Sequence, residues 1–173
     1  MGCSALNFVE IHNKYVGSWF SGIESLKTVV IGNEVKEIRT KAFQNCSGLE
    51  SVTIGSSVET IESKAFSDAD LSSVILLIEN PLEISGISVS YSPFSKNTFN
   101  NATLYVPVGT KDKYKSIKGW KDFKNIVEGE PAGIQSITLD EEKNTPIYDL
   151  NGRRLVSPQK GMNIIGGKKV VVK

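Results

Sequence analysis

The sequence predicts a mainly β protein with short helices, built as a short solenoid of stacked parallel strands. Three observations carry this prediction: a motif that repeats about every 23 residues, a later segment whose aromatic residues are spaced to close the end of such a stack, and a final segment of short β-branched stretches separated by turn residues. We therefore expect two domains, a repeat domain with a helical and aromatic cap over residues 1–128 and a small all-β unit over residues 134–173.

The repeat is seen when residues 26–32 (LKTVVIG) are aligned with residues 49–55 (LESVTIG), an offset of 23 (26 to 49). The match continues to a KAF triplet in both copies, and shorter flanking copies begin at Leu6 and Leu71. A unit of this length cannot bury its apolar side chains alone, whereas stacked units bury them against one another. Each unit is therefore expected to contribute one strand that is hydrogen-bonded in parallel to the strand of the next unit.

The strand part of each unit reads Leu-x-x-Val-x-Ile, and alternation along a strand places its Val and Ile on one face. We expect this face to be the core and the intervening residues to point outward, in two rows that align from unit to unit. The rows are small, uncharged and partly apolar apart from one glutamate, which suits a flat contact with an extended peptide or a sugar. Alternatively, these residues only reflect the preference of Thr, Val and Ile for strands. The candidate binding residues are Phe8, Thr28, Ser51 and Ser73 in the first row and Glu10, Val30, Thr53 and Ile75 in the second.

Equivalent positions in successive units are expected to stack, which bears on the phenylalanines and on the cysteines. Phe43 and Phe66 occupy the same position, so their rings should pack one above the other in the core. Cys3 and Cys46 hold the same position two units apart, and strands spaced by ~4.8 Å would separate their Cα atoms by roughly 10 Å. A disulfide tolerates at most about 7 Å, so both should be free thiols, with Cys46 buried.

The full motif, L-x-x-V-x-I-x-x-x-V-x-x-I-x-x-x-A-F-x-x-C over residues 26–46, resembles the BspA-like leucine-rich repeats of Bacteroidetes surface proteins. Residues 98–107 (TFNNATLYVP), with the aromatic residues that follow them, resemble the segment that closes such arrays. The resemblance covers roughly residues 3–128, although residues 77–97 do not follow the repeat. It implies a leucine-rich-repeat solenoid on a secreted or cell-surface protein that binds an extracellular protein or glycan.

The segment after residue 107 is expected to form the cap of the solenoid. Thr110 is placed to N-cap a short helix, with Asp112 in its first turn, where the helix dipole favours a negative charge. Six lysines between residues 111 and 124 are expected on a solvated outer face; alternatively, they bind an anionic partner weakly. The apolar residues recur at spacings of three and give one face to lay over the last repeat, namely Tyr114, Ile117, Trp120 and Phe123.

Residues 128–133 (EGEPAG) are typical of a linker, and a small β unit is expected beyond them. Residues 147–154 (IYDLNGRR), with lysine-containing stretches after them, resemble the end of type IX secretion sorting domains. This resemblance implies a role in export or surface retention; the alternative is a small β-module that caps or spaces the chain. About five strands are expected, over residues 134–140, 146–150, 153–156, 162–165 and 168–172.

Composition and motifs argue against several classes of function. Lysine plus arginine total 20 and aspartate plus glutamate 19, so a net charge of +1 argues against a nucleic-acid binder with a basic face. No apolar stretch approaches the ~20 residues of a membrane span. One histidine with two cysteines cannot form the usual four-ligand zinc site unless carboxylates supply the missing ligand, and no catalytic or nucleotide-binding motif occurs.

We therefore expect a non-enzymatic binding or adhesion protein that is secreted or at the cell surface. It should be a monomer that uses no metal or cofactor, with an extracellular protein or glycan as partner, no nucleic-acid partner and no membrane insertion. The alternative is a structural C-terminal fragment of a longer repeat array, whose terminal β unit serves export or surface attachment. The first residues lack the apolar core of a secretory signal, so we expect a mature fragment whose export signal has been removed.

Overall fold

The computed structural model describes residues 6–86, 90–129 and 131, and in the C-terminal part the backbone of residues 147–148, 154–155, 161–165 and 168–172. The chain divides into two compact units, Met1–Gln135 and Ser136–Lys173. The first unit, which we call the repeat domain, contains the repeats and their cap, and the second is the small β unit.

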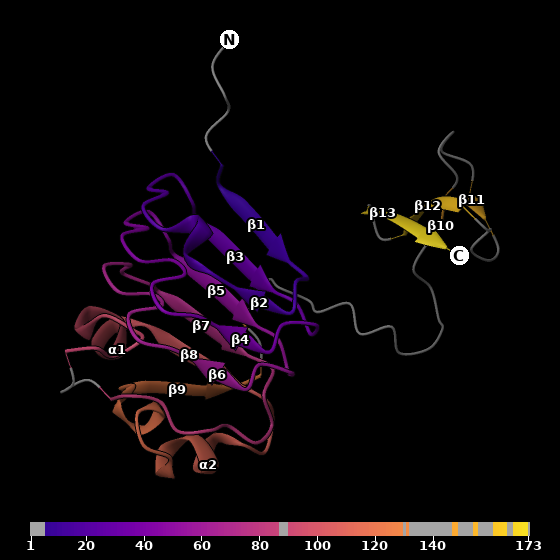
Figure 1. The fold of residues 1–173 in the computed structure, drawn as a ribbon. Coiled ribbons are helices and arrows are strands. Elements are labelled where there is room, and N and C mark those ends of the chain that lie inside the picture. Colours follow the sequence, from indigo (N-terminus) through magenta and orange to yellow (C-terminus); the bar gives the residue numbers. More distant parts are fainter. Residues whose placement is uncertain are drawn as a thin grey trace. The chain divides into compact units, whose positions relative to one another are not determined.

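The repeat domain is built around a six-stranded sheet in which every strand runs parallel to its neighbours (Figure 1). Its order, β1-β3-β5-β7-β8-β9, follows the chain, so each coil of the solenoid adds a strand beside that of the previous coil. The predicted solenoid of parallel strands is confirmed. The strands are β1 (Phe8–Ile11), β3 (Thr28–Ile31), β5 (Ser51–Ile54), β7 (Ser73–Leu76), β8 (Thr103–Val106) and β9 (Asn125–Glu128).

A second, shorter strand in each of three repeats builds a three-stranded parallel sheet from β2 (Tyr15–Val16), β4 (Glu37–Ile38) and β6 (Thr60–Ile61). Successive coils approach closely at the turn between the two sheets. A Cβ atom on Gly55 would lie 2.6 Å from the carbonyl oxygen of Gly32. Glycine therefore recurs at this position because the backbone of the neighbouring coil fills the space that a side chain would need.

The core contains the side chains that strand alternation placed inward. Leu26, Val29 and Ile31 are buried, as are their equivalents in the next two repeats. An aromatic column also runs through the coils, since the rings of Phe20, Phe43, Phe66 and Phe94 stack at centroid distances of 5.5, 5.2 and 5.3 Å with planes within 9°. The predicted stacking of Phe43 on Phe66 is confirmed, and the column extends by one ring at each end.

The turns that carry Phe43 and Phe66 share one backbone conformation. Lys41 and Lys64 adopt φ values of 62° and 57°, in the left-handed region, and Asn45 and Asp68 follow with 59° and 62°. Such a conformation costs a non-glycine residue on the order of 1 kcal/mol. Its recurrence at equivalent positions indicates that the packing of the phenylalanine turn imposes it.

Cys46 is a buried free thiol, as predicted. Its Sγ–H group donates to the carbonyl oxygen of Phe20 at 3.0 Å. Burial raises the pKa of the Cys46 thiol above its ordinary value. Cys3 lies outside the described residues, so its free state stays a prediction.

The segment that departs from the repeat is tied to the cap by two buried side chains. The Tyr114 hydroxyl donates to the carbonyl oxygen of Ile78 at 2.6 Å, and Trp120 Nε1 donates to that of Leu82 at 2.8 Å. Burial raises the pKa of Tyr114, so its hydroxyl keeps its proton as a donor. The chain then rejoins the stack at Phe94, and the helix α1 (Lys96–Asn101) leads into β8.

The cap consists of two short helical pieces, and the single apolar helix face that was predicted is not formed. The helix α2 (Lys111–Ser116) ends before Gly119, whose φ of +85° starts the 3-10 helix η2 (Trp120–Asp122). Residues at spacings of three on both sides of this break cannot share one helical face. Tyr114, Trp120 and Phe123 are nevertheless buried, and the last two contact Phe94 at the end of the column.

Thr110 does not N-cap α2 through its side chain, contrary to the prediction. Its Oγ1 donates to the carbonyl oxygen of Pro107 at 2.7 Å, and its backbone is already helical. The carboxylate of Glu128 takes the capping role, since its Oε1 accepts from the backbone N–H groups of Gly109 and Lys111, each at 3.0 Å. Because Glu128 lies in β9, this cap is a long-range contact that no local motif reveals.

The second unit is a four-stranded antiparallel sheet in the order β11-β10-β12-β13. Its strands fall within or next to four of the five predicted segments. The fifth, residues 134–140, lies outside the described residues. The strands are β10 (Ile147–Tyr148), β11 (Arg154–Leu155), β12 (Gly161–Ile165) and β13 (Lys168–Val172).

Candidate functional site

The six-stranded sheet brings all eight candidate residues into two rows on its outer face. We call this surface the strand face. Each residue of a row lies directly opposite its neighbours on adjacent strands, and strands in a sheet lie ~4.8 Å apart. The register aligns Phe8, Thr28, Ser51 and Ser73 in the first row and Glu10, Val30, Thr53 and Ile75 in the second.

Two strands that the repeat motif did not include extend both rows. The first row continues from Ser73 to Thr103 and Asn125, and the second from Ile75 to Tyr105 and Val127. The Asn125 side chain donates to Thr103 Oγ1 at 2.7 Å. The alternation in residues 103–106 (TLYV) matches that of the repeat strands, and it was the available signal for Thr103 and Tyr105.

The solvent exposure of the side chains varies along the strand face. Phe8 is 50% exposed at one end, and most of the residues between the ends are half-buried. Ile75 is only 4% exposed and so offers no open contact surface, contrary to expectation. Ile75 lies between Thr53 and Tyr105 in the second row and forms part of the wall of a groove that Leu77, Pro107 and Gly129 also line, so neighbouring groups cover it.

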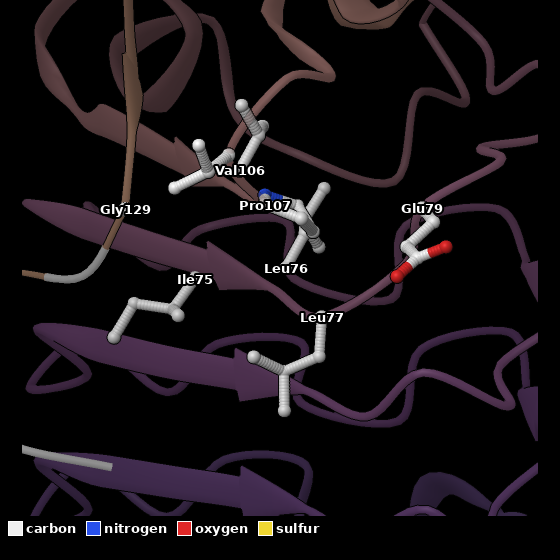
Figure 2. A pocket seen from close by; sticks show the side chains of 8 residues that line it. Ile75, Leu76, Leu77, Glu79, Val106, Pro107 and Gly129 are labelled. Carbon is white, nitrogen blue, oxygen red and sulfur yellow. The ribbon is translucent and has the colours of Figure 1, made fainter. Parts of the chain in front are cut away.

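This groove, of about 280 Å³, interrupts the strand face at the ends of β7 and β8 (Figure 2). Pairing of β7 with β8 ends at Ile75 and Tyr105, whereas β8 stays paired with β9 to its last residue. Pro107 follows β8 and has no N–H group to continue the ladder, so the strands separate there. The lining is mostly apolar and comprises Ile75, Leu76, Leu77, Glu79, Val106, Pro107, Val108 and Gly129.

Ionisable side chains lie close together at one end of the second row. His12 lies between two carboxylates, with Nε2 3.2 Å from Glu10 Oε1 and Nδ1 3.0 Å from Glu34 Oε2. The hydrogen bond with Glu34 raises the pKa of His12 and lowers that of Glu34. Beyond Glu10, the two rows carry no charged side chain among the residues that the register aligns.

Within the described ranges, no three His, Cys, Asp or Glu side chains converge in a way that would hold a metal ion. The same residues contain no helix with the length and apolarity to cross a bilayer. The strand face presents hydroxyl, amide, aliphatic and aromatic groups. These groups suit hydrogen bonding and van der Waals contact with a partner.

A model of the BspA type leucine-rich repeat region matches residues 1–104 of the chain, in six copies. Comparison with curated proteins and with solved structures gives no significant match. The matched residues are more than half of the 173 in the chain and include the first four strands of the strand face. The chain therefore belongs to the BspA-type leucine-rich repeat family.

Proposed function

We propose that this chain is a non-enzymatic binding protein, secreted or displayed at the cell surface, which holds an extracellular protein or glycan on its strand face. One observation carries the proposal: two rows of side chains, uncharged apart from Glu10, stay in register across six parallel strands. Membership of a leucine-rich repeat family is consistent with a binding role.

The strand face is rigid before any partner arrives. Each inner strand is hydrogen-bonded on both sides, and the stacked phenylalanines fix the spacing of the coils. A partner therefore pays little conformational entropy on this side of the interface, which leaves more of the contact energy for affinity. Val30, Thr53 and Tyr105 lie in one row and combine apolar contact with hydroxyl groups.

The test begins with a screen of the full chain against immobilised extracellular-matrix proteins and a glycan array. A variant that carries Val30→Lys, Thr53→Lys and Tyr105→Lys then places three charges along the second row. Ile75 is left intact because its burial would make a lysine there disrupt the fold. The matched control adds the same charge at exposed positions outside the six strands, Asn13→Lys, Thr60→Lys and Ser90→Lys.

We expect the row variant to lose at least about tenfold in affinity for the ligands found in the screen, and the control to keep wild-type affinity. Both variants should melt close to wild type. Equal affinities of the two variants would contradict the strand face as the binding site. A folded wild-type chain that binds nothing in the screen would contradict the binding function itself.

As a finer proposal, the second unit acts as the end of a type IX sorting domain in a Bacteroidetes bacterium. The support is the resemblance of residues 147–154 to such domains and the antiparallel sheet to which β10 and β11 belong. The test compares the surface-exposed fraction of the full chain with that of a chain ending at residue 135, in a bacterium that has this secretion system. Equal fractions would contradict the proposal.

A further inference from the structure

Two exposed aromatic rings contact each other outside the strand face. Tyr15 lies in β2, at the edge of the three-stranded sheet, and Trp19 lies in the 3-10 helix η1 (Ser18–Phe20) that follows. Their ring centroids are 5.5 Å apart and their planes are tilted by 47°. Trp19 is 55% exposed and Tyr15 37%. Tryptophan is highly buried on average, and an adjoining exposed Tyr–Trp pair presents apolar ring faces with polar edges to a ligand.

The backbone and one neighbouring coil fix the position of both rings. The indole of Trp19 packs against Gly17, where a Cβ atom would lie 3.1 Å from its Cε2 and Nε1 atoms. The guanidinium of Arg39 lies 3.6 Å from the centroid of the Tyr15 ring and covers one of its faces. We call these two rings with Arg39 and its partner Glu37 the aromatic platform.

Glu37 completes the platform and balances its charge. Its Oε2 accepts from Arg39 Nε at 3.0 Å, and its backbone pairs with Tyr15 in the sheet. Arg39 and Glu37 are a cation and an anion, so the four side chains carry no net charge. A guanidinium has five N–H donors and a carboxylate accepts several hydrogen bonds, so both donors and acceptors remain for a ligand.

From these contacts we infer that the aromatic platform binds a neutral sugar ring, which stacks on Trp19 and hydrogen-bonds to Arg39 and Glu37 through its hydroxyls. A pyranose has a face of C–H groups that matches an aromatic ring, and each of its hydroxyls both donates and accepts. Charge matching disfavours a phosphate or an acidic peptide, because Arg39 is already paired with Glu37. A protein partner needs about 800 Å² on each side, far more than two rings provide.

The experiment uses the full chain on an array of neutral glycans, followed by a fluorescence titration with the strongest hit. Only Trp19 and Trp120 contribute tryptophan emission, and Trp120 is 1% exposed, so a sugar that stacks on Trp19 changes the exposed component. Trp19→Ala should lower the affinity at least about tenfold, whereas Trp19→Phe should keep most of the binding and lose the signal. Tyr91→Ala, which removes a 57% exposed ring elsewhere, is the matched control and should bind as wild type does.

The outcomes separate this inference from the proposed role of the strand face. Loss of neutral-glycan binding in Trp19→Ala, with binding kept in the Val30, Thr53 and Tyr105 triple variant, supports the aromatic platform. The reverse pattern assigns the sugar to the strand face and overturns the inference. A folded wild-type chain that binds no neutral glycan on the array also overturns it, even if a matrix protein binds the strand face.

Discussion

Phe66 is the ring whose removal tests the aromatic column most severely. It is fully buried and stacks between Phe43 and Phe94, at centroid distances of 5.2 and 5.3 Å. Truncation of a buried phenylalanine to alanine costs about 3–5 kcal/mol. Phe66→Ala also removes two stacked ring contacts of ~0.5–1.5 kcal/mol each, and the truncation cost already includes part of this energy. We therefore expect a loss at the upper end of the range, about 4–5 kcal/mol. In a unit of this size that corresponds to a fall in Tm of roughly 12–20 °C.

Phe20 supplies the internal comparison. It is half-buried and, among the described residues, stacks on Phe43 only, so Phe20→Ala should cost about 1–3 kcal/mol. Guanidinium denaturation followed by tryptophan emission measures the free energy of unfolding of both variants, since both tryptophans lie in the repeat domain. Phe66→Leu should be far less costly than Phe66→Ala because most of the apolar volume remains. Equal losses for Phe66→Ala and Phe20→Ala, or a Phe66→Ala midpoint close to wild type, would refute the column as the organising element of the core.

Three further changes test other parts of the structure. In a Cys3→Ser background, Cys46 should resist thiol reagents until the protein unfolds, because it is buried and burial raises its pKa; labelling in the native state at the rate of a free thiol would contradict this. Hydrogen bonding to Glu34 raises the pKa of His12 and lowers that of Glu34, so this contact contributes fully only between the ordinary pKa values of the two groups, 4.5 for Glu34 and 6.5 for His12. Its contribution is lost as the pH rises through the folded pKa of His12 or falls through that of Glu34. An NMR titration should show Glu34→Gln lowering the pKa of His12 toward its ordinary value, and an unchanged pKa would show that the bond is not formed. Gly48→Ala should destabilise the repeat domain by about 1–3 kcal/mol in chemical denaturation, because the added Cβ would lie 2.1 Å from the carbonyl oxygen of Glu24. A variant as stable as wild type would mean that the coils are more widely spaced.

The repeat strands could be predicted because both their period and their alternation are local properties of the sequence. The offset of 23 residues placed Phe43 on Phe66, and the two candidate rows followed from alternation alone. Phe20 also precedes Phe43 by 23 residues, but a tryptophan replaces the alanine before it and obscures the match. Phe94 follows Phe66 by 28 residues, a spacing that breaks the period although the ring still stacks.

The features that sequence reasoning missed depend on contacts between distant residues. Tyr114 and Trp120 reach back to the carbonyl groups of Ile78 and Leu82, and no pattern within either segment indicates these bonds. The burial of Ile75 depends in the same way on groups far along the chain that line the same groove, among them Pro107 and Gly129. The aromatic platform was missed for a similar reason, since Arg39 meets the Tyr15 ring only when two coils stack.

Site-specific photocrosslinking tests the central claim, that the strand face is the binding surface, most directly. A benzophenone amino acid replaces Thr53, which lies half-buried in the second row, or, as the control, Thr60, which lies exposed in β6. Each variant is irradiated with the matrix protein that binds most tightly in the screen. We predict crosslinked product from position 53 and little from position 60. Crosslinking from position 60 alone would place the partner outside the strand face and contradict the proposed site.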